Sequence, residues 1–301
     1  MSSVLKSLLG IVGAVLIGIL LSFSPIPGSY LKIWVSVGLI ILLTGIFSRV
    51  RLGGILEAWK KGFYLRTALI GNFVFLPLLA LGISFLVFDK IELTLAFFLY
   101  LLTPCTDWFL AFTKLSCGDV ERNTALLPLN LVTQLIMLPF VLFFIVGRWV
   151  PIPPPTLIKV LAVYLGIPLS GSWLIKHLSL SRVAQICGKE EWLWLAIAGL
   201  FGSLGSDILS FSKILPLYLG AIALYLVFVL VVSWKVGQRI FKDISQAKAL
   251  SCTMIARNSP LVLAIVVGLF PEKPLIPALI AAGPLVELPL LSIFAILVRQ
   301  L

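Results

Sequence analysis

The chain has 301 residues, of which 60% are hydrophobic and only 12% are charged, and its formal net charge is +11. A soluble domain of this length carries roughly 25% charged residues, so the composition excludes a protein whose whole surface faces water, and we predict an integral membrane protein. The basic residues lie in short segments between apolar runs, where they act as topology signals, so no nucleic-acid partner is expected.

About ten apolar runs have the length of roughly 20 residues that a helix needs to cross the hydrocarbon core. In chain order these predicted spans lie near residues 7–23, 30–48, 67–88, 91–115, 122–147, 155–178, 190–209, 212–235, 246–270 and 274–299. The first run is interpreted as a retained helix, because it lacks a small-x-small cleavage site and more spans follow it. Backbone groups in lipid must be satisfied within the segment, so runs of this length form helices. The predicted fold class is all-α, with residues 1–301 forming a single transmembrane domain.

The Lys and Arg residues alternate in abundance from one predicted loop to the next, and they are more numerous on the side of the N-terminus. Positive residues accumulate in cytoplasmic loops. This asymmetry therefore predicts a multi-pass protein of the plasma (inner) membrane with both termini cytoplasmic.

The two halves of the chain, about 1–150 and 151–301, resemble each other. A constant offset of 156 residues aligns Pro104 with Pro260, Pro128 with Pro284 and Thr103 with Ser259. Each half would hold five spans, and an odd number of spans turns the second half upside down relative to the first. Two inverted five-helix repeats are the plan of many secondary transporters.

The predicted fourth and ninth spans are both interrupted by proline, at Pro104 and Pro260. Proline removes a backbone donor and clashes with the preceding turn, so each helix should break there. Opened backbone at membrane depth is tolerated only inside the protein or beside a watery cavity. Matching broken helices that cross therefore point to a transport site; the simpler alternative is that both prolines merely kink packed helices.

Three ionisable residues, Asp107, Arg257 and Glu287, lie within predicted spans. A charge at the bilayer centre is costly, so it usually faces the interior and has a partner. Asp107 and Arg257 are predicted to pair where the broken helices cross, either in the transport mechanism or as a static brace. Glu287 suits a proton carrier, because a low dielectric favours the neutral acid unless the group is paired. The alternative is that Glu287 is a second partner of Arg257.

Several polar or soft side chains flank the two breaks. Cys105 offers a thiol for a soft ligand, although buried cysteine often acts as a small hydrophobe. Thr106 and Asn258 are candidate substrate-binding residues beside it. Asn130 and Gln134 share one helix face at positions i and i+4, where they either line the cavity or bond to neighbouring helices. The four cysteines show no CxxC spacing and no accompanying histidines, so neither a structural metal site nor a cofactor is expected.

Four short motifs lie in or near the fourth and last predicted spans. They are Thr103-Pro104-Cys105-Thr106-Asp107-Trp108, Phe112-Thr113-Lys114-Leu115, Cys117-Gly118-Asp119 and Gly283-Pro284-Leu285-Val286-Glu287-Leu288-Pro289. Together they resemble the arsenic-resistance branch of the bile acid:sodium symporter superfamily, and the resemblance covers essentially the whole chain. It implies inverted five-helix repeats divided into a core and a panel, with the broken helices crossing in the core. It also implies that Cys105 and Glu287 occupy the cysteine and glutamate positions of arsenite exporters.

The sequence departs from that pattern in two places. Arsenite exporters carry aliphatic residues after the cysteine, whereas this chain has Thr106, Asp107 and Trp108. The sodium-coupled relatives carry a Gln-Asn pair in the ninth span, and here Arg257 replaces the glutamine while Asn258 remains. A guanidinium repels sodium unless it is neutralised, so proton coupling or passive export is favoured over sodium symport.

The leading prediction is a secondary transporter that exports arsenite or a related metalloid. Cys105 would bind the substrate, Glu287 would carry a proton, and Asp107 with Arg257 would set the geometry of the crossing. The alternative is a sodium- or proton-coupled organic-anion transporter, similar to bile acid carriers, in which Arg257 holds the anion. An intramembrane enzyme is not expected, because the sequence has no HExxH motif or comparable catalytic cluster.

Overall fold

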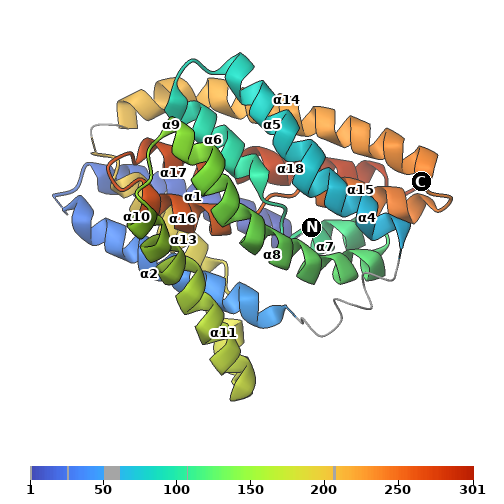
Figure 1. Ribbon diagram of the computed structural model, residues 1–301, viewed down its shortest axis with the longest axis horizontal. Coiled ribbons are helices and arrows are strands. Elements are labelled where there is room, and N and C mark those ends of the chain that lie inside the picture. The colour runs from blue at the N-terminus through green and yellow to red at the C-terminus, as the bar shows by residue number, and fades with distance from the viewer. Residues whose placement is uncertain (1, 26, 51–61, 107, 206–207) are drawn as a thin grey trace. The chain divides into compact units, whose positions relative to one another are not determined.

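The computed structural model describes residues 2–25, 27–50, 62–106, 108–205 and 208–301 (Figure 1). Within these ranges the regular structure is helical, apart from one isolated antiparallel bridge between Pro104 and Arg257. Seven helices of the described chain are long and apolar enough to cross a membrane: Leu5–Ser22, Gly28–Arg49, Phe63–Val87, Val120–Trp149, Pro154–His177, Phe211–Ile240 and Leu275–Leu297. The predicted all-helical, multi-pass membrane protein is thereby confirmed.

The helices lie in the chain order of the predicted spans, and the number of about ten spans stays a prediction. They are α1 (Ser2–Ser22), α2 (Gly28–Arg49), α4 (Phe63–Ile70), η2 (Gly71–Phe75), α5 (Leu76–Val87), α6 (Ile91–Leu102), α7 (Trp108–Leu115), α8 (Val120–Val141), η3 (Leu142–Val146), α9 (Gly147–Trp149), α10 (Pro154–Leu161), η4 (Ala162–Gly166), α11 (Ile167–His177), α12 (Ser181–Cys187), α13 (Glu191–Gly202), α14 (Ile208–Ile240), α15 (Ile244–Ile255), α16 (Ser259–Leu269), α17 (Leu275–Ala282) and α18 (Pro284–Leu297). The elements labelled η are π-helical turns within longer helices, a feature frequent at functional sites. The residues of the predicted fourth span form two helices, α6 and α7, and those of the ninth form α15 and α16.

The chain divides into two compact units, each built from three separate stretches of sequence. The first unit contains residues 2–50, 139–218 and 259–285, and the second contains 62–138, 219–258 and 286–301, as far as these are described. Each unit takes segments from both halves of the chain. The division into inverted repeats at about residue 150 stays a prediction.

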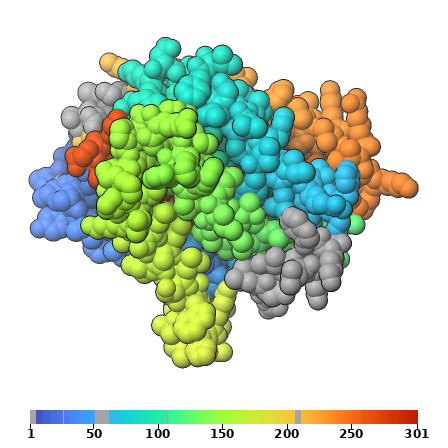
Figure 2. Space-filling view, in the orientation of Figure 1, coloured from blue at the N-terminus to red at the C-terminus, as the bar shows by residue number. Residues whose placement is uncertain are grey.

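Within the first unit, α13 packs against both α1 and α2. A Cβ atom on Gly18 of α1 would lie 2.5 Å from the Cβ atom of Phe201 on α13, so the close approach of these helices requires glycine. Small residues at such contacts let helix backbones come together in membranes. In the same unit, α10, η4 and α11 form one continuous helix, and the space-filling view shows its side chains as a column on the surface (Figure 2). Its exposed side chains include Ile158, Ile167 and Trp173, as expected for a lipid-facing helix.

Within the second unit, α14 runs antiparallel to the helix formed by α4, η2 and α5. The ring of Phe241, just beyond the end of α14, lies 6.0 Å from the ring of Phe63 and 5.4 Å from that of Tyr64 at the start of α4. Further along, the hydroxyl of Tyr225 donates to the carbonyl of Leu76 at 2.8 Å. The next helix, α15, packs against α4, η2 and α7. These contacts place η2 beside the end of α15, where the second break begins.

The start of α15 is capped by Asp243 in the preceding loop. Its carboxylate accepts hydrogen bonds from the hydroxyl and the backbone amide of Ser245, at 2.6 and 2.9 Å. These bonds stabilise the charged form, so they hold the pKa of the Asp243 carboxyl below its usual value. An acidic cap also complements the positive end of the helix dipole.

Candidate functional site

The two breaks lie side by side in the second unit and satisfy each other's backbone groups. The amide of Cys105 donates to the carbonyl of Ala256, and the amide of Asn258 donates to the carbonyl of Thr103, both at 2.9 Å. Backbone that leaves a helix inside a membrane protein must find such partners. The extended segments after α6 and α15 therefore hold together as a short antiparallel pair, which explains how both helices can open at buried positions.

The two prolines act differently at these breaks. Pro104 lies within the first break and forms the isolated bridge with Arg257. Pro260 is the second residue of α16, a first-turn position where proline is tolerated because its missing amide has no intrahelical partner anyway. The second opening therefore lies at residues 256–258, just before Pro260.

Arg257 is buried, with 3% of its surface exposed, and its guanidinium caps the ends of two helices. Nε donates to the carbonyl of Ile255 and Nη1 to that of Leu101, both at 3.1 Å. Nη2 donates to the carbonyls of Thr253, at 3.3 Å, and Met254. Carbonyls in the last turn of a helix lack intrahelical partners, and the C-terminal end carries partial negative charge. The positive charge of Arg257 is therefore stabilised by the C-termini of α6 and α15.

Asn72 ties the π-helical turn η2 to this cap. Its side-chain oxygen accepts from Nη2 of Arg257, and its amide donates to the hydroxyl of Thr253, each at 3.3 Å. Asn72 is fully buried. The side chain of Asn72 therefore lies directly against the guanidinium.

Glu287, in the first turn of α18, is held at the second break through both of its oxygens. Oε1 accepts from the backbone amide of Arg257 at 3.0 Å, and Oε2 accepts from the hydroxyl of Tyr100 at 2.5 Å. Among the described residues, no ion pair joins Glu287 to the guanidinium of Arg257. The carboxylate therefore contacts the backbone of the break and the last turns of α6. Tyr100 was missed by the sequence analysis, although its position one turn before Pro104 was an available signal.

A cluster of buried amides on α8 completes the site. The amide of Asn258 donates to the hydroxyl of Thr106 at 3.4 Å and to the side-chain oxygen of Gln134 at 3.3 Å. The amide nitrogen of Gln134 and both amide atoms of Asn130 have no partner among the described residues, although neither side chain is exposed. Buried polar atoms are nearly always hydrogen-bonded, and an exception needs an explanation. Because these atoms lie on one helix face that reaches the second break, we infer that they can bind a polar molecule.

The remaining predicted residues are placed as follows. Cys105 and Thr106 are buried in the first break, whereas Asp107 lies outside the described residues, so its predicted pairing with Arg257 stays a prediction. Cys252 lies on α15 with its sulfur 3.8 Å from the hydroxyl of Ser116. That contact places the Cys252 thiol on the side of α15 that meets the end of α7.

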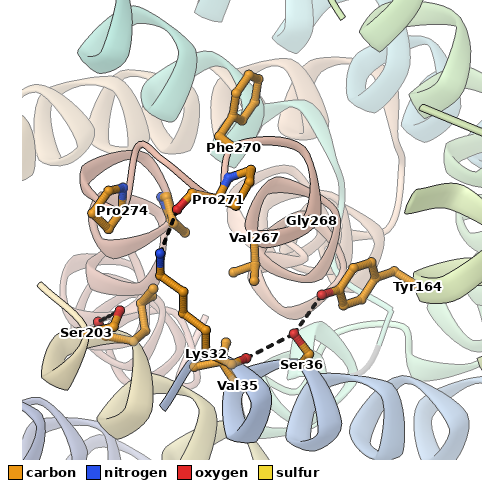
Figure 3. Close-up of a pocket in the computed structure, with 12 residues that line it drawn as sticks. Lys32, Val35, Ser36, Tyr164, Ser203, Val267, Gly268, Phe270, Pro271 and Pro274 are labelled. Atoms are coloured by element: carbon orange, nitrogen blue, oxygen red, sulfur yellow. Dashed lines mark hydrogen bonds between the residues drawn. The ribbon is translucent and has the colours of Figure 1, made fainter. Parts of the chain in front are cut away.

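A separate cavity of about 260 Å³ lies in the first unit (Figure 3). Lys32 crosses it and donates to the carbonyl of Pro271 at 2.9 Å, while the hydroxyls of Ser36 and Tyr164 are hydrogen-bonded at 2.8 Å. None of the predicted site residues lines this cavity. The polar side chains that line this cavity are hydrogen-bonded within the protein, whereas amide atoms of Asn130 and Gln134 on α8 are not.

The Sodium Bile acid symporter family matches residues 36–240 of the chain. The chain is also 22% identical over 283 residues to the "Arsenical-resistance protein Acr3" of Corynebacterium glutamicum, an alignment that covers 85% of this chain and 75% of that protein. The resemblance that the four sequence motifs indicated is thereby confirmed.

Proposed function

Because the chain belongs to the sodium bile acid symporter family of secondary transporters, we propose that it exports arsenite or a related metalloid across the plasma membrane. The similarity to an arsenical-resistance protein supports this class of substrate. The observation that carries the proposal is the set of unpaired buried amide atoms of Asn130 and Gln134, which lie on the α8 face that reaches the paired breaks.

The chemistry of trivalent arsenic suits this set of side chains. Its hydroxide is neutral near pH 7 and thiophilic, so Cys105 in the first break would bind arsenic as a soft ligand. A sulfur–arsenic bond forms as the thiol proton and one arsenic hydroxyl leave together as water. The other hydroxyls both donate and accept hydrogen bonds, and so do the amides of Asn130 and Gln134.

Glu287 is proposed to couple transport to protons. As a carboxylate, it accepts hydrogen bonds from the hydroxyl of Tyr100 and the backbone amide of Arg257. Protonation would convert one of its oxygens from an acceptor into a donor, so one of the two bonds would have to change. Proton binding would thereby be communicated to the last turns of α6 or to the backbone of the second break.

The alternative is an organic-anion transporter, which the family name supports. In that case the guanidinium of Arg257 would bind the carboxylate or sulfonate of the substrate. Its N–H groups already donate to four helix-end carbonyls and to Asn72. Nη1 donates only one of these bonds and has a second N–H, so an anion bound by two N–H groups would have to displace at least one of these contacts. This cost favours a neutral metalloid.

Arsenite uptake into everted membrane vesicles tests the proposal. We expect Cys105→Ser to abolish uptake, while Cys252→Ser, which changes a buried thiol beside Ser116, retains it. Glu287→Gln should remove the dependence of uptake on an imposed proton gradient. Equal uptake by the wild type and Cys105→Ser would refute a role for the thiol. Competition by taurocholate, used as the organic-anion probe, would instead support the alternative.

A further inference from the structure

We propose that the second unit binds one anionic glycerophospholipid in a groove between α4–η2 and α14, with its headgroup on Arg66 and Arg239. The groove has a volume of about 270 Å³. It is lined by residues of three helices: Thr67, Ile70, Gly71, Phe75, Leu76, Val229, Val232, Ser233, Val236, Leu250 and Met254. This site is separate from the paired breaks, and its proposal does not depend on the transported substrate.

The lining of the groove suits a hydrocarbon chain. Its two hydroxyl-bearing side chains, Thr67 and Ser233, each donate to a carbonyl of their own helix, at 2.9 and 3.1 Å. The groove therefore presents apolar atoms to its occupant. Ile70 and Phe75 at its rim are exposed, with 61% and 46% of their surfaces accessible, whereas Met254 at its floor is buried. The groove thus opens toward the membrane and not toward the protein interior.

The length of the groove matches one leaflet of the bilayer. From Thr67 to Phe75 the helix rises about 12 Å, at roughly 1.5 Å per residue. Half of the ~30 Å hydrocarbon core is about 15 Å. An acyl chain of one leaflet would therefore fill the groove along its length, with its headgroup beyond Thr67.

The charged end of the groove identifies the headgroup. Arg66 precedes Ile70 by four residues on α4, and Arg239 follows Val236 by three on α14, so each guanidinium shares a face with lining residues. Phe63 and Phe241, 6.0 Å apart between ring centroids, mark where the two helix ends meet. Both arginines are exposed, and neither forms an ion pair with another described residue. Two unpaired cations at one mouth favour an anionic headgroup over a zwitterionic one.

The predicted topology agrees with this assignment. The distribution of basic residues predicts that this end of α4 and α14 is cytoplasmic. Anionic lipids are enriched in the cytoplasmic leaflet, and each basic residue near the surface of that leaflet strengthens the attraction between the protein and these lipids. A lipid of that leaflet would therefore meet both arginines at headgroup depth.

The inner end of the groove reaches the capped break. A Cβ atom on Gly71 would lie 1.9 Å from the terminal methyl carbon of Met254, so η2 and the side chain of Met254 are in close contact there. The carbonyl of Met254 accepts from Arg257, and the neighbouring Asn72 also contacts this guanidinium. An acyl chain against Met254 would thus support the helix end that Arg257 caps.

Native mass spectrometry of the purified full chain tests the proposal. The probes are phosphatidylglycerol and phosphatidylcholine with identical acyl chains. We expect one phosphatidylglycerol to bind at least tenfold more tightly than phosphatidylcholine. Arg66→Gln and Arg239→Gln should each weaken phosphatidylglycerol binding roughly fivefold, the contribution of one basic residue near an anionic surface. Arg182→Gln, which changes an exposed arginine on α12, should leave binding unchanged.

Three further variants test the groove and the charge at its mouth. Val232→Phe fills it and should abolish retention of the lipid, whereas Val231→Phe, on an exposed neighbouring position that does not line it, should not. The double variant Arg66→Lys, Arg239→Lys keeps both positive charges and should keep the preference for phosphatidylglycerol. This result would show that the Gln variants act by removing charge and not by damaging the fold. Equal binding of both lipids by the wild type, or unchanged binding by the Val232→Phe variant, would overturn the proposal.

Discussion

Replacing Arg257 by methionine tests the proposed cap of α6 and α15. Methionine keeps much of the length and apolar volume of the arginine stem but removes every donor of the guanidinium. The backbone amide of residue 257 would still donate to Glu287. The substitution therefore removes the bonds from the guanidinium to the helix-end carbonyls and to the side chain of Asn72, and keeps the backbone bond.

The size of the effect follows from the acceptors that lose their donor. Four carbonyls, those of Leu101, Thr253, Met254 and Ile255, receive hydrogen bonds from the guanidinium. A buried polar group left unsatisfied costs about 1–3 kcal/mol. Taking about 1 kcal/mol for each carbonyl, the lower end of this range, since a carbonyl has a second lone pair, Arg257→Met should destabilise the fold by about 4 kcal/mol. At roughly 2 °C per kcal/mol for a chain of this size, the melting temperature should fall by about 8 °C.

Thermal unfolding of the purified protein in detergent provides the measurement. Arg257→Lys should lower the melting temperature by about half as much as Arg257→Met, because an ammonium retains three donors. Arg182→Met, at an exposed position on α12, should change stability by less than about 0.5 kcal/mol. If Arg257→Met melted within about 2 °C of the wild type, the carbonyls would not depend on this guanidinium and the capping argument would be wrong.

Three further predictions follow from the described contacts. Tyr100→Phe removes the 2.5 Å bond to Glu287. It should slow proton-coupled uptake about tenfold, since a bond to a charged group is worth about 1.5–3 kcal/mol. The binding of arsenite, measured by equilibrium dialysis, should not change. Asn130→Leu removes two unpaired amide atoms, so it should raise the melting temperature by about 2 °C or more while lowering arsenite uptake. A lower melting temperature would show that the amide of Asn130 is hydrogen-bonded after all. Gly18→Ala places a methyl group 2.5 Å from Phe201 and should cost about 1–3 kcal/mol, whereas Gly13→Ala, with nothing within 4 Å, should be tolerated in the same unfolding assay.

The positions of the helices could be predicted because apolar length is a local property of the sequence. The predicted span 30–48 and the observed α2, Gly28–Arg49, differ by two residues or fewer at each end. Proline likewise acts on its own neighbourhood, so the interruptions of the fourth and ninth spans were visible in advance. The second opening lies before Pro260 because proline fits the first turn of α16, a detail that depends on where that helix begins.

The partners of the buried charges could not be predicted in the same way. Charges along the sequence did not indicate that the guanidinium of Arg257 donates to helix-end carbonyls and to Asn72, and its predicted pairing with Asp107 stays a prediction. Backbone carbonyls are present at every position, so composition cannot show which of them lack an intrahelical donor. That information appears only when α6 and α15 are known to end beside each other. The bond between Tyr100 and Glu287 likewise depends on two helices, α6 and α18, that are far apart in the sequence.

The hydrogen bonds of the two buried ionisable side chains, Arg257 and Glu287, argue for an uncharged substrate. Arg257 faces helix-end carbonyls, and each carboxylate oxygen of Glu287 already accepts a hydrogen bond. Among the described residues of the second unit, the buried side-chain atoms without a partner are amide atoms of Asn130 and Gln134. An anion held by Arg257 would have to take N–H groups from the carbonyls that they cap, and a cation would meet a buried guanidinium of like charge. A neutral molecule with hydroxyl groups would gain the unused hydrogen bonds without the desolvation of an ion, which is why the proposed site discriminates by hydrogen bonding and thiol affinity before it discriminates by charge.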